Sequence, residues 1–414
     1  MLRITILLSA LLVAGSAAAQ TTLEQYTERV VEYSIELEQS LLNIESQEWE
    51  LKRSLKEYLP ELSLDRTAEV DFRHRDAGRA WSWATRLEAR QTIYDGGAVT
   101  AQRRKQELEV SISRLTERMT IRAVRLEAEE MYWRLSHATE YLNSMRYYLS
   151  IIDTLRGVIG RRYTEGYSAK GDLLQIESRL SDARYQLSAA EEAYDVALHS
   201  FNSLCNNPIN TPALLAETII TSRPLPQRQE TERVIENHPE LRIATLEADQ
   251  GRWNVRSVNS AYMPHIDIRA YTTLEPRYPH TATSGLNLGA GAMLSFSSTI
   301  FRFGERYNAL QSARAAQLEL ELEIEAVRDA IRLAEGDAWT TLERTHERVV
   351  ALERSLEIAS ENLEISTYAY NEGETSILDV MQAQISWLQT YKNYLAAHYD
   401  YAMARARYRY VTED

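Results

Sequence analysis

Apolar and polar side chains alternate with a period of two in two separate parts of the chain. The alternation predicts strands at about 61–73 and 81–94 in the first part, and at about 265–275 and 286–301 in the second. Each strand is about 10 to 14 residues long, the length that a tilted strand needs to cross a bilayer. A half-buried sheet in a soluble domain shows the same alternation, but the sequence offers no second layer to cover two hairpins. We therefore expect the apolar face of these strands to meet lipid.

The segments between the strands have helical periodicity and contain very few prolines. The longest helices are expected at 98–159 and 305–369, where no proline occurs, and the second carries apolar side chains at coiled-coil steps of three and four residues. At a rise of 1.5 Å per residue, each would be about 90 to 100 Å long. Shorter helices are predicted at 22–58, 172–204, 230–262 and 376–411.

The same sequence motif occurs twice in the chain, once after each predicted long helix. The letters YTEGYSAKGDLLQ begin at Tyr163 and YNEGETSILDVMQ begin at Tyr370, and TIYDGG at Thr92 recurs as TIFRFG at Thr299 with the same separation. Self-similarity at a fixed separation indicates a tandem duplication. The predicted organisation is a signal peptide at 1–19, a first repeat at 20–204, a linker at 205–229 and a second repeat at 230–414.

The N-terminus has the composition of a secretory signal peptide. Arg3 precedes an apolar run up to Val13, and small residues lead to a predicted cleavage site after Ala19. The run is too short for a membrane-spanning helix. The linker is rich in proline, and a short helix is expected near 213–219. Two interpretations fit the linker equally well, a plain connection or a belt at mid-height of the long helices.

Charge and motif content exclude several functions. A formal net charge of -14 offers no basic face for nucleic acid, and Cys205, as the only cysteine, cannot form an intramolecular disulfide. The histidines are scattered, without zinc spacing, and no phosphate-binding glycine loop occurs. We therefore expect no enzyme, no metal site and no cofactor. A secreted periplasmic coiled-coil spacer or tether would make use of the long helices, although it leaves the strands unexplained.

Taken together, these features resemble the TolC-like outer-membrane efflux proteins. The resemblance rests on the tandem repeat, on the letters NHPEL at Asn237, on IYDGG and IFRFG after the second strand of each repeat, and on the turn pattern Tyr-x-x-Gly-x-[Ser/Thr]-x-x-x-Asp. It implies a mainly α fold with a membrane β-barrel. A long α-helical barrel or coiled coil would continue a trimeric twelve-stranded barrel, to which each chain contributes four strands.

The resemblance also implies a function and partners. The chain would be the passive exit duct of a tripartite efflux or type I secretion system. It would lie in the outer membrane of a Gram-negative-type cell and extend into the periplasm. Its partners would be two further copies in a homotrimer, outer-membrane lipid, a periplasmic adaptor protein that opens the duct, and an inner-membrane pump.

Site residues follow from the same resemblance. The duplicated turns would be hairpin tips on which the adaptor docks, formed by Tyr163, Gly166, Tyr167, Ser168, Asp172, Tyr370, Gly373, Glu374 and Thr375. Asp379 would form an acidic ring in the periplasmic entrance gate and favour cations, with Gln382 where a second acidic ring would stand. Glycine suits a helix end, and Ser, Thr or Asp can cap the next helix, so capping alone is an equally good interpretation.

Overall fold

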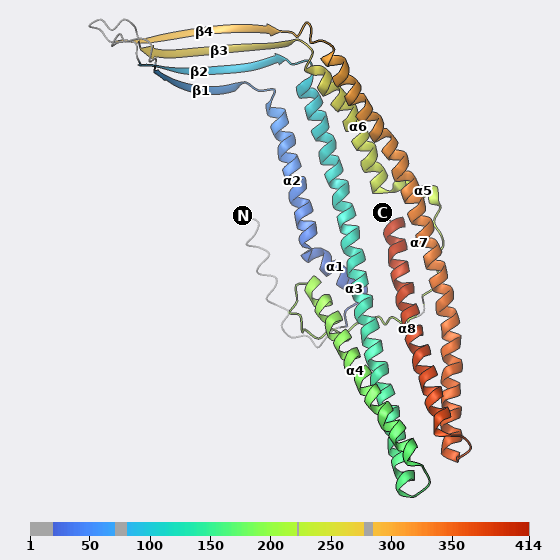
Figure 1. Ribbon diagram of the computed structural model, residues 1–414. Helices are drawn as coiled ribbons and strands as arrows, with labels where there is room; N and C mark the ends of the chain where they lie inside the picture. The colour runs from blue at the N-terminus through green and yellow to red at the C-terminus, as the bar shows by residue number, and fades with distance from the viewer. Residues whose placement is uncertain (1–19, 71–80, 222, 277–284, 414) are drawn as a thin grey trace. The chain divides into compact units, whose positions relative to one another are not determined.

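The computed structural model describes residues 20–70, 81–221, 223–276 and 285–413 (Figure 1). The predicted signal peptide and residues 71–73 of the first predicted strand lie outside these ranges. The elements are α1 (Leu23–Tyr33), α2 (Ile35–Lys56), β1 (Glu61–Val70), β2 (Trp81–Tyr94), α3 (Ala98–Thr164), α4 (Lys170–Leu204), α5 (Thr231–Asn237), α6 (Pro239–Ser260), β3 (His265–Pro276), β4 (Leu286–Ser297), α7 (Glu305–Glu372) and α8 (Ile377–Thr412).

The predicted class, mainly α with four strands in each chain, is confirmed. The two long helices are longer than expected, with 67 residues in α3 and 68 residues in α7. No described helix combines the length and the hydropathy that a membrane crossing requires.

Two helices that the sequence predicted as continuous are broken. The predicted helix 22–58 divides at Ser34, whose backbone is extended and whose hydroxyl accepts the N–H of Leu37 (3.2 Å), so that Ser34 starts α2. The predicted helix 230–262 divides at His238. Pro239 is the first residue of α6, and a residue before proline is sterically driven to the extended backbone that His238 adopts.

Two further expectations were wrong. The last strand ends at Ser297 rather than 301 because its partner strand begins at His265, directly after Pro264, and their pairing leaves no ladder beyond Ser297. The short helix near 213–219 does not form. The linker there is instead bridged to residue 21, with the Thr21 N–H donating to the carbonyl of Leu214 (2.8 Å).

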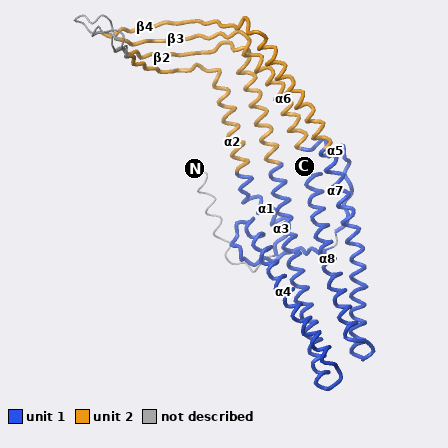
Figure 2. The backbone as a smooth tube through the Cα atoms, viewed as in Figure 1, with its two compact units in different colours: residues 1–38, 119–238, 330–414 blue, residues 39–118, 239–329 orange. Residues whose placement is uncertain are grey.

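The described chain falls into two compact units (Figure 2). Unit 1 comprises residues 1–38, 119–238 and 330–414, and unit 2 comprises 39–118 and 239–329. Both long helices pass from one unit into the other. Each unit is described separately below.

Unit 2 contains an antiparallel sheet in the order β1-β2-β3-β4. Its register aligns apolar side chains on one face, as in the row Leu62, Ala89, Ala270 and Ala292 across the four strands. The adjacent row, on the opposite face, reads Glu61, Arg90, Arg269 and Met293. Since neighbouring residues of a strand point to opposite faces, the sheet has one apolar and one largely polar face.

The helices of unit 2 lie side by side in the same order as the strands. Gln106 of α3 donates a hydrogen bond to Gln47 of α2 (2.7 Å), and Lys105 of α3 donates one to Asn254 of α6 (3.1 Å). An ion pair between Arg252 and Glu321 (3.4 Å) joins α6 to α7. The helical part of unit 2 is therefore a single layer, with α2 and α7 as its outermost members.

In unit 1, α4 packs against the C-terminal part of α3, and α8 packs against the C-terminal part of α7 (Figure 1). One apolar cluster joins the two helix pairs and contains Ile159, Ile176 and Val380, which are fully buried. A second cluster holds α1 and the linker on the same helices, where the rings of Tyr26 and Phe201 stack 3.9 Å apart. The hairpin turns therefore lie at the ends of firmly packed helix pairs.

Candidate functional site: the two hairpin tips

Tip 1, residues 161–172, reverses the chain between α3 and α4. The backbone N–H of Gly166 donates to the carbonyl of Tyr163 (3.1 Å), and that of Tyr167 donates to the carbonyl of Arg162 (2.7 Å). These two bonds define the Schellman ending of a helix, which satisfies carbonyls that the helix itself leaves free. Gly166 has φ +83°, a conformation that side chains with a Cβ rarely adopt.

Tip 2, residues 368–379, repeats this geometry between α7 and α8. Gly373 donates to the carbonyl of Tyr370 (3.1 Å), and Glu374 donates to that of Ala369 (2.8 Å). Gly373 also has φ +83°. The duplicated phrase therefore encodes the same helix ending twice, and the tyrosine and glycine of the phrase occupy the same places in both turns.

The tips differ in how the returning helix begins. In tip 2, Ser376 is the N-cap of α8. Its N–H donates to the carboxylate of Asp379 (3.1 Å), and its hydroxyl donates to the same carboxylate (2.6 Å). The Thr375 hydroxyl donates to the carboxylate as well (2.7 Å). Hydrogen bonds from Ser376 and then Thr375 hold the pKa of Asp379 below its usual range.

In tip 1 the N-cap position of α4 is Ala169, which has no side-chain oxygen to accept a hydrogen bond. Only half of the capping arrangement remains, in which the Ala169 N–H donates to the carboxylate of Asp172 (3.2 Å). Ser168, which matches Thr375 in the repeat, is half-buried. Helix capping is thus a real role of both acidic residues, and it is more complete in tip 2.

The matched tyrosines lie in different surroundings. Tyr370 is 6% exposed and belongs to the apolar cluster of unit 1, whereas Tyr163 is 39% exposed. At the position after the glycine, Tyr167 is 81% exposed in tip 1, and Glu374 is exposed in tip 2. Tip 1 therefore exposes two tyrosines to solvent, whereas tip 2 exposes carboxylates.

Asp379 and Gln382 both lie exposed on the first turns of α8, while Val380 and Met381 between them are buried. Positions three residues apart share one side of a helix. The two predicted gate residues therefore occupy the same solvent-facing side of α8.

One residue of the site was missed by sequence reasoning. Arg162, in the last turn of α3, donates to the carbonyls of Tyr370 (3.2 Å) and Asn371 (2.9 Å) at the end of α7. Its guanidinium also lies 4.7 Å from the centre of the Tyr370 ring. A cation is favoured at a helix C-terminus, and here it is supplied by a different helix. The available signal was asymmetry, because the repeat has Ala369 where the first copy has Arg162.

The charges of the two tips are opposite in sign. Tip 1 has three basic and two acidic residues, a net charge of +1, from Arg161, Arg162, Lys170, Glu165 and Asp172. Tip 2 has no basic residue and a net charge of -3, from Glu372, Glu374 and Asp379. Whatever binds both tips meets two different electrostatic surfaces.

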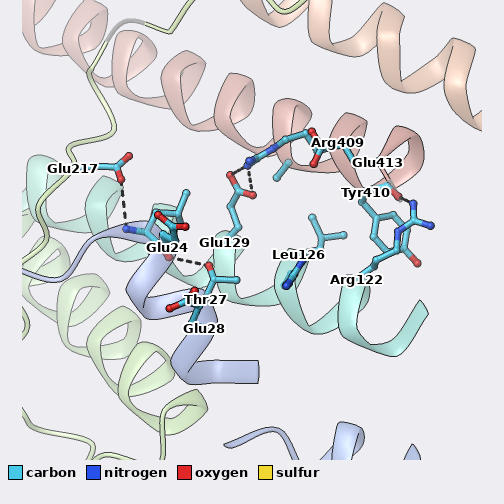
Figure 3. A pocket seen from close by; sticks show the side chains of 13 residues that line it. Glu24, Thr27, Glu28, Arg122, Leu126, Glu129, Glu217, Arg409, Tyr410 and Glu413 are labelled. Carbon is cyan, nitrogen blue, oxygen red and sulfur yellow. Dashed lines mark hydrogen bonds and ion pairs between the residues drawn. The ribbon is translucent and has the colours of Figure 1, made fainter. Parts of the chain in front are cut away.

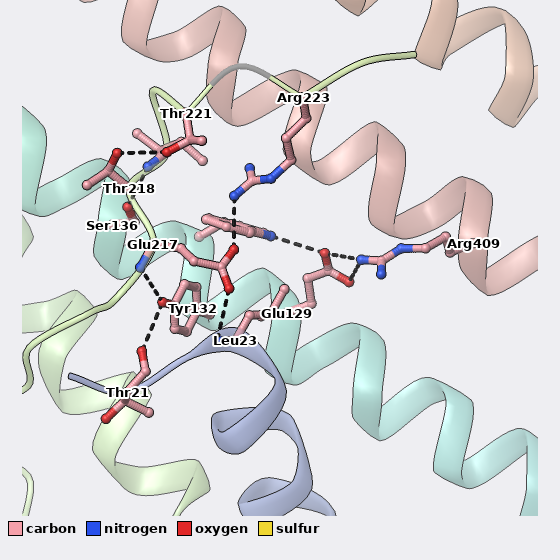
Figure 4. A network of polar contacts seen from close by, with 12 residues as sticks. Thr21, Leu23, Glu129, Tyr132, Ser136, Glu217, Thr218, Thr221, Arg223 and Arg409 are labelled. Atoms are coloured by element: carbon pink, nitrogen blue, oxygen red, sulfur yellow. Dashed lines mark hydrogen bonds and ion pairs between the residues drawn. The ribbon is translucent and has the colours of Figure 1, made fainter. Parts of the chain in front are cut away.

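The part of the linker around Glu217 is hydrogen-bonded to α1 and α3 (Figure 4). The Tyr132 hydroxyl donates to the carbonyl of Thr21 (3.0 Å) and accepts the N–H of Glu217 (3.1 Å). Arg223 pairs with Glu217 (3.2 Å) and lies over the Trp133 ring (4.0 Å). Of the two interpretations of the linker, these contacts favour a belt bound to the helices.

A cleft of about 510 Å³ opens in unit 1 between α1, α3 and the end of α8 (Figure 3). Side chains of both charges line it, and several already pair with one another: Arg409 with Glu129, and Arg122 with the carbonyl of Tyr410. Within the described residues, no cluster of three His, Cys, Asp or Glu side chains suits a metal ion. Cys205 is buried, and burial raises the pKa of its thiol to about 11.

Comparison with known proteins agrees with this architecture. The profile of the family described as outer membrane efflux protein matches residues 28–207 and, a second time, residues 231–410. The outer membrane protein TolC of Escherichia coli (strain K12) is 21% identical over 359 residues, which cover 83% of this chain and 72% of that protein.

Solved structures with the same fold include CusC, whose crystal structures concern transmembrane channel formation. It has 14% identity and a TM-score of 0.82, over 97% of this chain and 95% of that one. The open state of the Neisseria gonorrhoeae MtrE outer membrane channel has 16% identity and a TM-score of 0.80, over 94% of this chain and 88% of that one. Because the family profile spans most of the sequence in two copies, this chain belongs to the outer membrane efflux protein family and is an outer-membrane efflux channel that extends into the periplasm.

Proposed function

We propose that three copies of the chain form a passive exit duct of a tripartite efflux or type I secretion system, which a periplasmic adaptor opens and an inner-membrane pump supplies. The observation that carries the proposal is the four-stranded sheet of unit 2, which has an apolar face and two outermost strands, β1 and β4, without a partner among the described strands. Unpaired strand edges are costly in lipid, and closure into a barrel removes them.

The register supports closure by identical copies. If β4 of one copy pairs with β1 of the next, three copies give a ring of twelve strands, four from each chain. The row that contains Leu62 and Ala270 would face lipid, and the row that contains Arg90 and Arg269 would face the water-filled interior.

The helical layer of unit 2 supports the same arrangement. On its outermost helices, large apolar side chains are exposed, namely Leu41, Leu42 and Trp49 of α2 and Leu318 and Leu322 of α7. A single helix layer cannot cover these side chains itself. Contact of α2 in one copy with α7 in the next would bury them and continue the layer into a tube.

For the tips, we propose adaptor docking and gating. Arg162 links the end of α3 to the end of α7, so that the two helix pairs of unit 1 are held together at their tips. An adaptor that binds the tips would open the duct by favouring a state in which this link is broken. Asp379, with Gln382 on the same side of α8, would line the entrance and favour cations.

Packing between copies of the chain would hold the proposed duct together. We assign no catalytic step to the duct. The alternative, a periplasmic spacer or tether, would use the long helices but gives no purpose to an exposed apolar sheet face.

The first test is fractionation of cells that express the full-length protein, followed by mass determination of the detergent-extracted particle. An outer-membrane particle of three chains is expected. A soluble periplasmic monomer or dimer would overturn the duct and favour the spacer.

The gate assignment is tested separately by single-channel recording. Asp379→Lys should reduce the preference for cations over anions. Because this change also removes a helix cap, Ser376→Ala serves as the control, since it weakens the same cap without changing the charge. Equal ion selectivity in Asp379→Lys and Ser376→Ala would remove Asp379 from the gate.

A further inference from the structure

One histidine of α8 is buried at a point where α7, α8 and the linker of unit 1 meet. His398 is 3% exposed, and its ring lies edge to face with that of Tyr394, 4.5 Å between centres. The ring is hydrogen-bonded to the backbone of Ile219 in the linker. Its Nε2 has no hydrogen-bond partner among the described residues. A charged ring would carry an N–H at Nε2, and the Glu353 carboxylate, at 3.8 Å, is too distant to accept it.

The same side of α8 holds the linker a second time, one turn further along the helix. The Tyr401 hydroxyl donates to the carbonyls of Arg223 and Pro224 (3.1 Å each). Helix positions three residues apart share one side, so this tyrosine and the histidine contact the linker together. We call residues 219–221 and 223–224 the linker strap.

Beyond the strap, the linker is fixed by groups whose charge does not change near neutral pH. Arg228 donates two hydrogen bonds to the carboxylate of Glu335 in α7 (3.0 and 2.8 Å), whose side chain is fully buried. The Gln229 N–H donates to the hydroxyl of Tyr408 in α8 (3.0 Å). Carboxylates and tyrosines ordinarily titrate near pH 4 and pH 10. This end of the linker is therefore a fixed end, and the strap is the part that can detach.

The surroundings of His398 favour its neutral form. Burial is the largest influence and lowers the pKa of His398. The carboxylate of Glu353 opposes this change, and the guanidinium of Arg223 in the linker lowers the pKa further. The ring is thus best suited to its site when it carries no charge.

The other charged groups of this cluster do not titrate near neutral pH. Arg223 pairs with Glu217 of the linker (3.2 Å; Figure 4). Burial, and then the charges of Glu353 and of Glu140 in α3, raise the pKa of Tyr394. Of the groups that face one another here, the histidine is the one that changes charge between pH 8 and pH 5.

The first repeat lacks this arrangement. The position that matches His398 is Glu191, which is exposed, and the position that matches Glu353 is Arg146, which is also exposed. A helix pair of this kind therefore does not need a buried histidine. The histidine occurs in the copy whose returning helix is covered by the linker.

We propose that His398 is an acid-sensitive latch, in which protonation of the ring detaches the linker strap from α8 while the pair of Arg228 and Glu335 keeps the far end in place. With the strap attached, a charged ring would be buried beside a guanidinium, with its second N–H unpaired. Detachment admits water to the charged ring. The attached state binds the proton less tightly than the detached state, so it is favoured at high pH and is lost as the pH falls below about 6.5, the ordinary pKa of histidine.

The latch does not rest on the proposed duct, because every contact that forms it lies within unit 1 of one chain. It also makes no use of docking or gating at the tips. Detachment would loosen the connection between the two repeats on the side of the second helix pair. A failed latch would therefore leave the duct standing, and a failed duct would leave the latch standing.

The test is amide hydrogen exchange in the full-length protein between pH 8 and pH 5, corrected for the intrinsic pH dependence. The reporters are the amides of Ile219, which donates to the Ser136 hydroxyl (2.8 Å), and of Thr221, which donates to the carbonyl of Thr218 (3.2 Å). Their exchange should quicken by up to about tenfold for each pH unit below about 6.5. The Gln229 amide should keep its protection. Constant protection of Ile219 down to pH 5, or an equal loss at Gln229, overturns the latch.

Two substitutions fix position 398 in a single charge state. His398→Asn stays neutral and keeps an amide N–H near the place of Nδ1, so the strap should be as protected at pH 5 as at pH 8. His398→Arg is charged at every pH, so the strap should already be unprotected at pH 8. An acid response that persists in His398→Asn, or a protected strap in His398→Arg, contradicts the latch.

Two other histidines of unit 1 provide matched controls. His137 of α3 is half-buried, and burial lowers its pKa as well. His346 of α7 lies against the ring of Tyr401, 5.2 Å between centres. In His137→Asn and His346→Asn, the ratio of strap exchange at pH 5 to that at pH 8 should stay within about twofold of the original protein. Loss of the acid response in either control would remove its assignment to His398.

Discussion

The two hairpin tips share a backbone but differ in most of their side chains. Both end a long helix with the same pair of carbonyl contacts and a glycine at φ +83°. Around this turn, tip 1 is basic and carries exposed tyrosines, and tip 2 is acidic and fully capped. After duplication, therefore, the residues that define the turn were kept, whereas the surface residues became free to differ. Under the proposed function, the three copies of the chain would offer the adaptor two kinds of docking surface.

The largest expected effects come from substitutions of the two turn glycines, which test whether the tips share one backbone geometry. Gly166→Ala and Gly373→Ala each place a Cβ on a left-handed residue, at a cost of about 1 to 2 kcal/mol. No atom lies within 4 Å of the added Cβ at either position, so the cost comes from the backbone alone. Amide hydrogen exchange in each tip should quicken roughly 5- to 30-fold. Unequal effects in the two tips would contradict a common turn geometry.

The link between the tips gives the next largest effect. Arg162→Gln removes the cation that contacts the two carbonyls at the end of α7, at a cost of about 1 kcal/mol, since the residue is only half-buried. Exchange should quicken in tip 2 as well as tip 1, and channel openings should become more frequent. Arg161→Gln is the matched control, because it removes the same charge from an exposed neighbour. If Arg162→Gln and Arg161→Gln give the same result, the positive charge of tip 1, rather than the contacts of Arg162 with α7, explains the effect.

Substitutions at the two N-cap positions, Ser376 and Ala169, test the difference in capping between the tips. Ser376→Ala should destabilise the start of α8 by about 1 kcal/mol, whereas Ala169→Ser should stabilise the start of α4 by roughly 0.5 kcal/mol. Each change copies the cap residue of the other tip. Amide hydrogen exchange is measured in both tips of the same sample, so that each tip serves as the control for the other. Stabilisation of α4 would fail to appear if Ala169→Ser cannot turn its hydroxyl toward Asp172.

Much of the fold could be predicted because it follows from local rules. The two-residue alternation gave the strands, the absence of proline gave the long helices, and the exact spacing of Tyr163 and Tyr370 gave the duplication. The predictions were wrong where a segment distant in the sequence determines the local structure. The end of β4 depends on where β3 begins, and residues 213–219 bond to residue 21 instead of forming a helix.

The candidate site divides in the same way. The turn glycines and capping residues were visible in the sequence because each acts on neighbours within a few positions. The contact of Arg162 with α7 was not, since it joins residues 208 positions apart and depends on how two helix pairs pack. The break at Ser34 was missed for a different reason, because a single hydroxyl decides whether one helix continues or a second begins.

The smallest expected effect is the response of tip 2 to acid, which depends on a single carboxylate, that of Asp379. Hydrogen bonds from Ser376 and Thr375 hold the pKa of Asp379 below its usual range. A carboxylate whose pKa is lower in the folded than in the unfolded state stabilises the fold above its unfolded pKa of about 4, and this stabilisation is lost as the pH falls through the folded pKa. Protection of the first turn of α8 should therefore decline below about pH 4.

Asp379→Asn is the control for this decline. It should show weaker protection at neutral pH, because the amide accepts these hydrogen bonds less strongly than the carboxylate, and its protection should change little with acid. The measurement is hydrogen exchange in the peptide that begins α8, corrected for the intrinsic pH dependence and compared between the two proteins at each pH. If the original protein and Asp379→Asn lose protection in parallel, another group controls the acid response of tip 2.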